Sequence, residues 1–108
     1  MPPWQRRVLT RLRALAATGR VVFTAKARGE MAAAGLRPED VLDILASLRR
    51  AEPIERLRSA RSGEWLYVFR PDVGGDPFYL KVVLRSGCTL VSCHEDAHEA
   101  ASEATDGE

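Results

Sequence analysis

The chain has 108 residues, enough for one hydrophobic core but too few for two, and a single folded domain over residues 1–96 is expected. Its uninterrupted apolar runs are only a few residues long, far below the roughly 18 that a membrane-spanning helix needs, and no secretory leader is recognisable, so we expect a cytoplasmic protein. The net charge of +1 conceals an asymmetry, because residues 94–108 contain six acidic and no basic residues, whereas residues 1–93 contain 16 basic and nine acidic ones.

Arginine accounts for fourteen of the 16 basic residues. Because the planar guanidinium binds phosphate through paired hydrogen bonds, a polyanionic partner is one interpretation, and a GC-rich genome that encodes Arg in place of Lys is the other. The segment 97–108 is acidic with few large apolar side chains, so we expect a disordered tail. Cys88 and Cys93 should lie about 16 Å apart in an extended segment, too far for a disulfide, and should be reduced thiols.

Three helices are predicted in the first half of the chain, over residues 3–18, 25–34 and 38–50, with the extended stretch RVVFT between the first two. The first has apolar residues at helical spacing and ends before Gly19, a typical residue after a helix C-terminus. The second follows Thr24, whose hydroxyl can cap it. The third has a proline in its first turn and one apolar face.

From Pro53 onward the apolar residues recur with the period of two that is typical of strands. The predicted strands are PIERLRS, EWLYVFRP, PFYLKVVLR and TLVSC, and they are separated by RSG, a loop centred on VGGD, and SG. Hairpins of this kind make an antiparallel meander. We therefore expect an α+β fold, in which N-terminal helices pack on one face of a C-terminal antiparallel β-sheet.

The turns predict which residues lie opposite one another in this sheet. A two-residue loop at SG pairs Arg85 with Cys88 and therefore places Tyr79 opposite His94. A four-residue VGGD loop places Arg70 opposite Tyr79 from the other side. The result is a row of Arg70, Tyr79 and His94 on one face.

The RSG stretch predicts a three-residue hairpin with Gly63 in the left-handed conformation, which pairs Arg56 with Val68 and Arg58 with Leu66 on the face of the row. The core would lie on the other face and contain Leu57, Trp65, Tyr67, Phe69, Phe78, Leu80, Val82, Leu84, Val91 and Cys93. Four apolar residues remain on the polar face, part of which must be covered: Leu66, Val68, Val83 and Leu90. A slip of one residue would reverse the faces of any strand.

The chemistry of the row favours RNA cleavage in which a ribose 2′-hydroxyl attacks the adjacent phosphate. This reaction needs a base, an acid and cations, but no metal or cofactor. His94, with an ordinary pKa of about 6.5, can be base or acid, and Tyr79, with one of about 10, is better suited to donate a proton or to orient the substrate. The third catalytic candidate is Arg56, and the substrate-binding candidates are Arg70, Lys81, Arg58 and Arg85.

Other interpretations of these residues are structural. A Tyr–His pair on a sheet surface is often only a packing contact, and basic strands are often only solvated. The stretch C-x4-C-H-x3-H does not have a usual zinc spacing, and its Cys93 and His94 point to opposite faces. The aromatic residues of WLYVF alternate like a stacking platform for bases, but they lie on the predicted core face.

In order along the chain, ALAATGRVVFT followed by a helix pair, then W-L-Y-V-F-R-P, Y-L-K-V and V-S-C-H-E-D, resembles the motility quorum-sensing regulator (MqsR) toxins of bacterial toxin–antitoxin systems. The resemblance covers about residues 8–96. It implies a RelE-like ribonuclease fold and metal-independent cleavage of single-stranded messenger RNA. It also implies a cognate antitoxin that neutralises the toxin, often zinc-bearing and with a helix-turn-helix DNA-binding part.

The resemblance also implies roles for particular residues. Tyr79 matches the functional tyrosine of the family, and His94 stands where the best-known members have a catalytic lysine, a substitution that brings titration nearer to neutrality. Leu66 occupies the place of a functional glutamine and cannot hydrogen-bond. A further family lysine falls near Glu55 or Arg56, and charge and strand parity favour Arg56.

Three hypotheses follow for the function. The leading one is an endoribonuclease toxin of a toxin–antitoxin system. The second is a catalytically inactive relative that binds RNA, the ribosome or an antitoxin-like protein through its basic sheet face, and the third is a regulatory or structural protein whose sheet packs against a partner. The acidic segment after His94 either solubilises the chain or folds back over the cationic face.

Overall fold

The computed structural model describes residues 2–49 and 54–96. The elements are α1 (Pro3–Ala17), β1 (Val21–Phe23), α2 (Ala25–Ala33), α3 (Pro38–Ala46), β2 (Ile54–Arg58), β3 (Trp65–Phe69), β4 (Asp72–Val73), β5 (Asp76–Leu84) and β6 (Cys88–Glu95). The helices precede most of the sheet, so the predicted α+β fold is confirmed. No helix in the described ranges is long and apolar enough to cross a membrane. The predicted acidic tail, residues 97–108, lies outside those ranges.

The helices begin and end where local chemistry favours it. α1 has a proline in its first turn and ends before Gly19, whose φ of 74° suits a residue without a side chain. Thr24 caps α2, because its hydroxyl accepts a hydrogen bond from the N–H of Ala27 at 3.1 Å. α3 is shorter than predicted and ends at Ala46 instead of residue 50.

Among the described residues the sheet has six strands instead of the predicted four, in the order β1-β6-β5-β3-β2, and β4 pairs with β5 off this path. The RVVFT stretch supplies β1, which pairs in parallel with β6 and places Val21 opposite Cys88. The other pairs are antiparallel. The predicted antiparallel meander therefore forms, with one parallel strand added at its edge.

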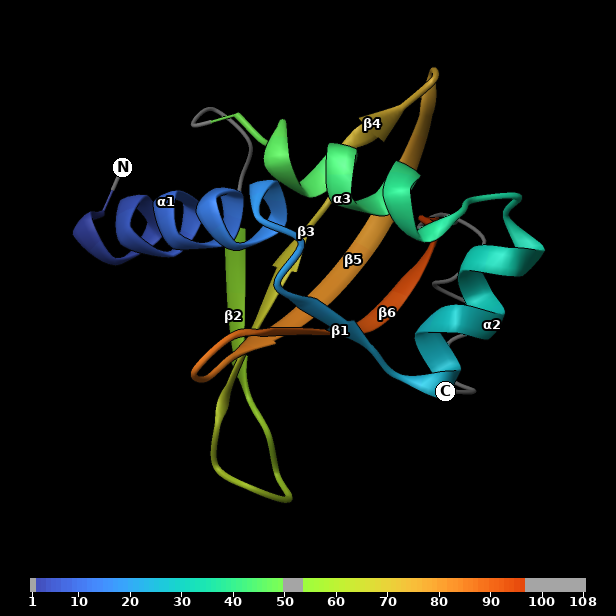
Figure 1. Ribbon diagram of the computed structural model, residues 1–108. Helices are drawn as coiled ribbons and strands as arrows, with labels where there is room; N and C mark the ends of the chain where they lie inside the picture. The colour runs from blue at the N-terminus through green and yellow to red at the C-terminus, as the bar shows by residue number, and fades with distance from the viewer. Residues whose placement is uncertain (1, 50–53, 97–108) are drawn as a thin grey trace.

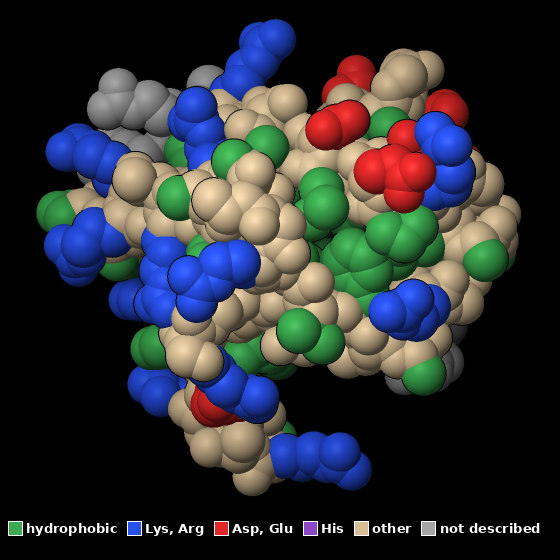
Figure 2. Space-filling model, viewed as in Figure 1, with side chains coloured by type: hydrophobic (Ala, Val, Ile, Leu, Met, Phe, Trp, Pro, Cys, Tyr) green, Lys and Arg blue, Asp and Glu red, His purple; other side chains and the backbone are tan. Residues whose placement is uncertain are grey.

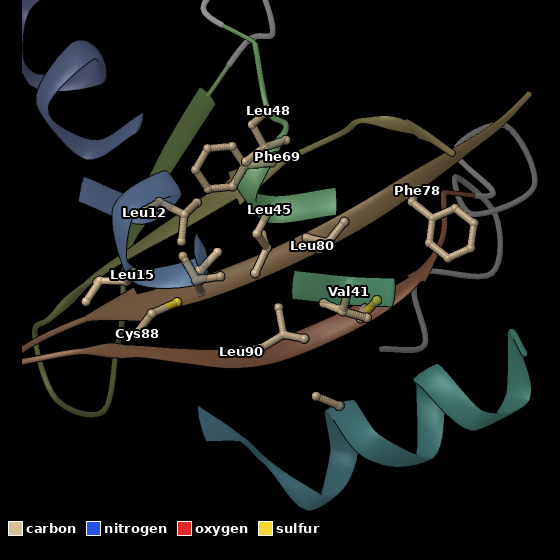
Figure 3. Packing of buried hydrophobic residues seen from close by; sticks show 14 of the residues in the cluster. Leu12, Leu15, Val41, Leu45, Leu48, Phe69, Phe78, Leu80, Cys88 and Leu90 are labelled. Atoms are coloured by element: carbon tan, nitrogen blue, oxygen red, sulfur yellow. The ribbon is translucent and has the colours of Figure 1, made fainter. Parts of the chain in front are cut away.

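The two faces of the sheet have different surroundings. α1 and α3 pack together over one face, which we call the helix face (Figure 1). Leu12 from α1, Leu45 from α3 and Leu80 from β5 are fully buried between these layers (Figure 3). α2 lies at the side of the sheet, next to β6. No described helix packs on the other face, which we call the open face and which carries Glu55, Leu66, Val68, Tyr79, Lys81, Val83, Ser92 and His94.

The pairing of β5 with β6 agrees with the predicted register at Tyr79 and His94 but differs from it near the turn. Tyr79 lies opposite His94, as predicted, but Leu84 and not Arg85 faces Cys88. A bulge at Val91 absorbs the extra residue between these two parts of the ladder. Because of this bulge, Leu90 points into the core and not onto the polar face, where it was predicted.

The predicted pairing of β2 with β3 is wrong by one residue. Arg56 pairs with Tyr67 and Arg58 with Trp65. The loop is longer than RSG, since the Ser59 N–H bonds to the carbonyl of Glu64 at 2.8 Å. The Ser59 hydroxyl stabilises this longer loop by accepting hydrogen bonds from two N–H groups inside it, each at 3.2 Å.

This slip exchanges the faces of β2. Arg56 and Arg58 lie on the helix face, whereas Glu55 and Leu57 lie on the open face. Leu57, predicted in the core, is 44% exposed.

Candidate functional site

The centre of the candidate site is a stacked pair of rings on the open face. Tyr79 comes from the central strand β5 and His94 from its neighbour β6, where the ladder makes them direct partners. Their ring centroids are 5.0 Å apart and their planes differ by 11°. Both side chains are half-buried. The predicted neighbourhood of these two residues is confirmed.

The backbone sets the protonation pattern of His94. Its Nδ1 lies 2.9 Å from the carbonyl oxygen of Glu95. A carbonyl oxygen can only accept, so Nδ1 carries the proton of the neutral ring. Nε2 therefore presents a lone pair when the ring is neutral and an N–H when it is charged, which is the behaviour required of a base that later acts as an acid.

Arg70 completes the predicted row, but it is held by two carboxylates. Its guanidinium carbon lies 5.2 Å from the centroid of Tyr79. It forms ion pairs at 3.1 Å with Glu55 of β2 and at 3.1 Å with Asp96, which follows β6. The two acids balance much of the positive charge of Arg70. Neither was predicted in the site, since Glu55 reaches it through the register slip and Asp96 lies after the last predicted strand.

Two lysines supply positive charge next to the stacked pair. Lys81 of β5 has its Nζ 5.9 Å from the centroid of Tyr79. Lys26 of α2 donates hydrogen bonds at 2.8 Å to Ser92, the partner of Lys81 across the ladder, and at 2.8 Å to Glu30. Lys26 was missed, because the sequence predicts α2 but not where the helix lies. Its only signal was the spacing of four residues from Glu30, typical of a helix ion pair.

Glu30 joins α2 to the edge of β6. Its carboxylate accepts a hydrogen bond from the N–H of Cys93 at 2.7 Å. Partial burial works to raise the pKa of Glu30, but the hydrogen bonds from Lys26 and from the Cys93 N–H outweigh it and hold this pKa below its usual range. The charged carboxylate therefore helps to fix the strand that carries His94.

A hollow of about 310 Å³ lies beside His94. It is lined by Glu30, Ala33, Ala34, His94 and Glu95. Ala33, the last residue of α2, and Ala34, which follows it, leave this space because their side chains are small. The imidazole thus lies at the rim of a concave surface that can receive part of a ligand.

Partial burial raises the pKa of the Tyr79 phenol above its usual range, although the charge of Arg70 acts in the opposite direction. Tyr79 is therefore protonated at neutral pH. A neutral phenol can donate a hydrogen bond or a proton, whereas the nitrogen lone pair of this pair of rings belongs to His94.

The structure does not bring three of the predicted residues to this site. Arg56 lies on the helix face, with its guanidinium carbon 4.2 Å from the ring of Trp4 and 4.4 Å from that of Trp65. Arg58 also lies over Trp65, at 3.9 Å. Arg85 is at the far end of β5 and pairs with Glu64 at 2.7 Å. The register slip explains the first two errors, and distance along the strand explains the third.

The two cysteines are free and buried. Burial raises the pKa of Cys88 to about 12 and that of Cys93 to about 11, so neither thiol is a ready nucleophile. In the described parts of the chain, no group of three or more His, Cys, Asp or Glu residues could hold a metal ion.

The fold and the site define a small α+β protein whose open sheet face presents an imidazole, a phenol and several cations. A family model described as "Motility quorum-sensing regulator, toxin of MqsA" matches residues 6–95. The protein is therefore a toxin of a toxin–antitoxin system. It belongs to the MqsR toxin family, as its sequence motifs predict, and this membership implies an antitoxin partner, MqsA in the description of the family. A comparison with curated proteins found no match.

Proposed function

We propose that this toxin is an endoribonuclease that cleaves single-stranded messenger RNA by attack of a 2′-hydroxyl on the adjacent phosphate. The observation that supports it best is the stacked Tyr79–His94 pair, in which only Nδ1 of the imidazole is engaged by the backbone. Family membership makes a cellular RNA a reasonable target for a growth-inhibiting toxin. Cleavage of messenger RNA would take place in the cytoplasm.

The proposed reaction uses both rings in turn. Nε2 of His94 takes the proton from the 2′-hydroxyl while the 2′-oxygen forms a bond to phosphorus. The bond from phosphorus to the 5′-oxygen then breaks, and the Tyr79 phenol gives its proton to the departing alkoxide, which is far more basic than phenolate. The imidazolium returns a proton to Tyr79, directly or through water. The products are a 2′,3′-cyclic phosphate and a 5′-hydroxyl, so atoms and charges balance.

The cations act on the charge that builds on the phosphoryl oxygens. Lys81 is in none of the ion pairs formed among the described residues and lies next to Tyr79, so it is the principal candidate for this role. Lys26 is a second candidate. Arg70, held by its two carboxylates, is better suited to keeping Tyr79 in place than to binding phosphate.

The experiment is incubation of purified, antitoxin-free protein with single-stranded RNA in EDTA. Cleavage with 2′,3′-cyclic phosphate ends is expected, and His94→Ala should slow it by about 10²- to 10⁴-fold. Thr89→Ala, on the same strand and face, is the matched control and should cleave at the wild-type rate. Full activity in His94→Ala would remove the assignment of the base.

A binding-only toxin is the second candidate, and two observations favour it. Arg70 is occupied by carboxylates, and Leu66, on the open face opposite Leu57, offers no hydrogen bond to a substrate. In that case Tyr79→Phe and His94→Ala would still inhibit growth and bind RNA. The same two variants therefore separate the candidates, if growth inhibition and cleavage are measured together.

A further inference from the structure

A second concentration of arginine and aromatic side chains lies on the helix face, away from the Tyr79–His94 pair. Arg56 lies between the rings of Trp4, on α1, and Trp65, on β3. Its guanidinium carbon is 4.2 Å from the ring centroid of Trp4 and 4.4 Å from that of Trp65. Arg58 lies over Trp65 at 3.9 Å. We call these four residues the Arg–Trp strip: Trp4, Arg56, Arg58 and Trp65. The strip lies along β2, the edge strand of the sheet.

The two arginines of the strip are available to a ligand. Both are exposed, and neither is in an ion pair with a described acid, whereas Arg37, Arg70 and Arg85 all are. Each guanidinium carbon lies over an indole ring. Arg58 donates one hydrogen bond to the carbonyl oxygen of Gly63 at 2.8 Å, and its other N–H groups and those of Arg56 can donate to an anion. Because stacking already restricts the side chain, less conformational entropy is lost when a phosphate binds.

The surroundings of the strip are also positive. α1 contains no acidic residue and carries four exposed arginines, Arg6, Arg7, Arg11 and Arg13. Figure 2 shows Lys and Arg side chains gathered over α1 and the β2–β3 hairpin, while Asp and Glu side chains gather at the other end of this view, over α3 and β4. The one acid of β2, Glu55, faces the open side and pairs with Arg70.

We propose that the Arg–Trp strip binds single-stranded nucleic acid, through phosphates that accept hydrogen bonds from both guanidinium groups and through a base that stacks on Arg58, which lies over only one indole ring. Alternating aromatic and arginine side chains in a positive surface are the combination that such ligands require. An acidic protein would be drawn by the charge but would gain less from the stacked planes. That the nucleic acid is RNA rests on the proposed function, whereas binding of a polynucleotide does not.

The position of the strip connects it to the row. Only β3 separates β2 from β5, so the strip and Tyr79 lie on strands about 10 Å apart, on opposite faces. A chain bound at the Tyr79–His94 pair can therefore continue round the free edge of β2 and reach Arg56. The strip would hold the part of the strand that flanks the site of cleavage.

The test measures binding of a fluorescent 2′-O-methyl RNA of about 16 nucleotides by anisotropy over a range of salt concentrations. The blocked 2′-hydroxyl prevents the proposed cleavage, so binding is measured whether or not the protein is a nuclease. The variant is Arg56→Gln/Arg58→Gln. We expect about tenfold weaker binding and a fall of about 2 in the slope of log K against log salt, one for each lost phosphate contact.

Two controls accompany this variant. Arg37→Gln removes an exposed arginine that is paired with Glu39 and Asp40, and it should bind like wild type. Arg56→Lys/Arg58→Lys keeps the charge but loses the planar fork, so the salt slope should stay and the affinity should fall by a smaller factor. This variant also decides the question if the glutamine variant fails to fold, as judged by circular dichroism.

Trp4 and Trp65 provide a second measurement, because the chain has 2 tryptophans and both belong to the strip. Their fluorescence should change when the oligonucleotide binds to wild type. Unchanged affinity and slope in Arg56→Gln/Arg58→Gln would overturn the inference. Unchanged oligonucleotide binding with loss of antitoxin binding would overturn it too and assign the strip to a protein partner. If binding of the oligonucleotide depends on the strip but the protein cleaves no RNA, the inference stands and only the proposed ribonuclease activity is ruled out.

Discussion

The two faces of the sheet use arginine in opposite ways. On the open face, Arg70 lies between two carboxylates, each 3.1 Å away, and its charge is largely balanced. On the helix face, Arg56 lies between two indole rings and in no ion pair with a described acid. The partners of an arginine, more than the number of arginines, therefore decide where a surface can attract an anion. In the proposed function the acid–base groups lie on the open face, and the guanidinium groups proposed to bind a ligand lie on the helix face.

The largest expected difference between the faces is in stability, and it is tested at two consecutive residues of β5, one on each face. Leu80 points into the core and is 0% exposed, so Leu80→Ala should lower the free energy of unfolding by about 2–5 kcal/mol. Lys81→Ala, on the open face, should change it by no more than about 0.5 kcal/mol. Denaturant unfolding monitored by circular dichroism measures both. Equal losses in the two variants would mean that the open face is as well packed as the helix face.

The same substitution on the two faces should separate chemistry from packing. Tyr79→Phe keeps the stacked ring and removes the phenol that we assign as the proton donor, so cleavage should slow by about 10²-fold. Tyr67 lies on the helix face, with its ring centroid 6.1 Å from that of Trp4. Tyr67→Phe removes its phenol group and should cleave at the wild-type rate. Initial rates on one RNA provide the measurement. If both variants slow cleavage equally, the effect is not specific to the row.

The pH dependence of stability should depend on Cys93, which lies next to His94 in sequence but points to the other face. Burial raises its pKa from 9.0 to about 11. The unfolded chain loses this proton first, so the stabilisation is complete below about pH 9 and disappears as the pH rises through about 11. Wild type should lose roughly 2 kcal/mol more than Cys93→Ala over this window. Parallel loss in both proteins would show that the thiol does not titrate there.

The smallest expected effect comes from removing one ion-pair partner of Arg70 on the open face. Glu55→Gln removes one of the two carboxylates on Arg70, so the affinity for 2′-O-methyl RNA should rise a few-fold and the salt slope should increase by about 1. Glu64→Gln frees Arg85 at the far end of β5 and is the matched control for a general change in charge. A similar gain in both variants would attribute the effect to net charge alone.

Much of the fold could be predicted from the sequence because the signals were local. Proline and glycine at helix ends, and the change of period after Pro53, identify the helices and the strands of the meander. The Tyr79–His94 pairing was also predicted, although the hairpin differs from the prediction in two features whose effects on the register cancel. The turn is one residue longer than SG, and the bulge at Val91 restores the register before His94.

The remaining parts depend on contacts that the sequence does not display. The β2–β3 loop is longer than RSG because the Ser59 hydroxyl holds it, and this alone moves Arg56 from the predicted site to the other face. The docking of α2 beside β6 brings Lys26 and Glu30 to the row, and no local pattern indicates where a helix docks. Register and docking are tertiary properties, so these residues could not be assigned in advance.

The hydrogen bond from the Cys93 amide to Glu30 also has a consequence for the edge of the sheet. β1 covers β6 only as far as Leu90, and the strand beyond that point would offer its backbone amides to any passing β-strand. The partly buried carboxylate of Glu30, which is also paired with Lys26, occupies one of these amides. The helix thereby removes one of the backbone donors that a strand from a neighbouring molecule would need in order to add to this border of the sheet.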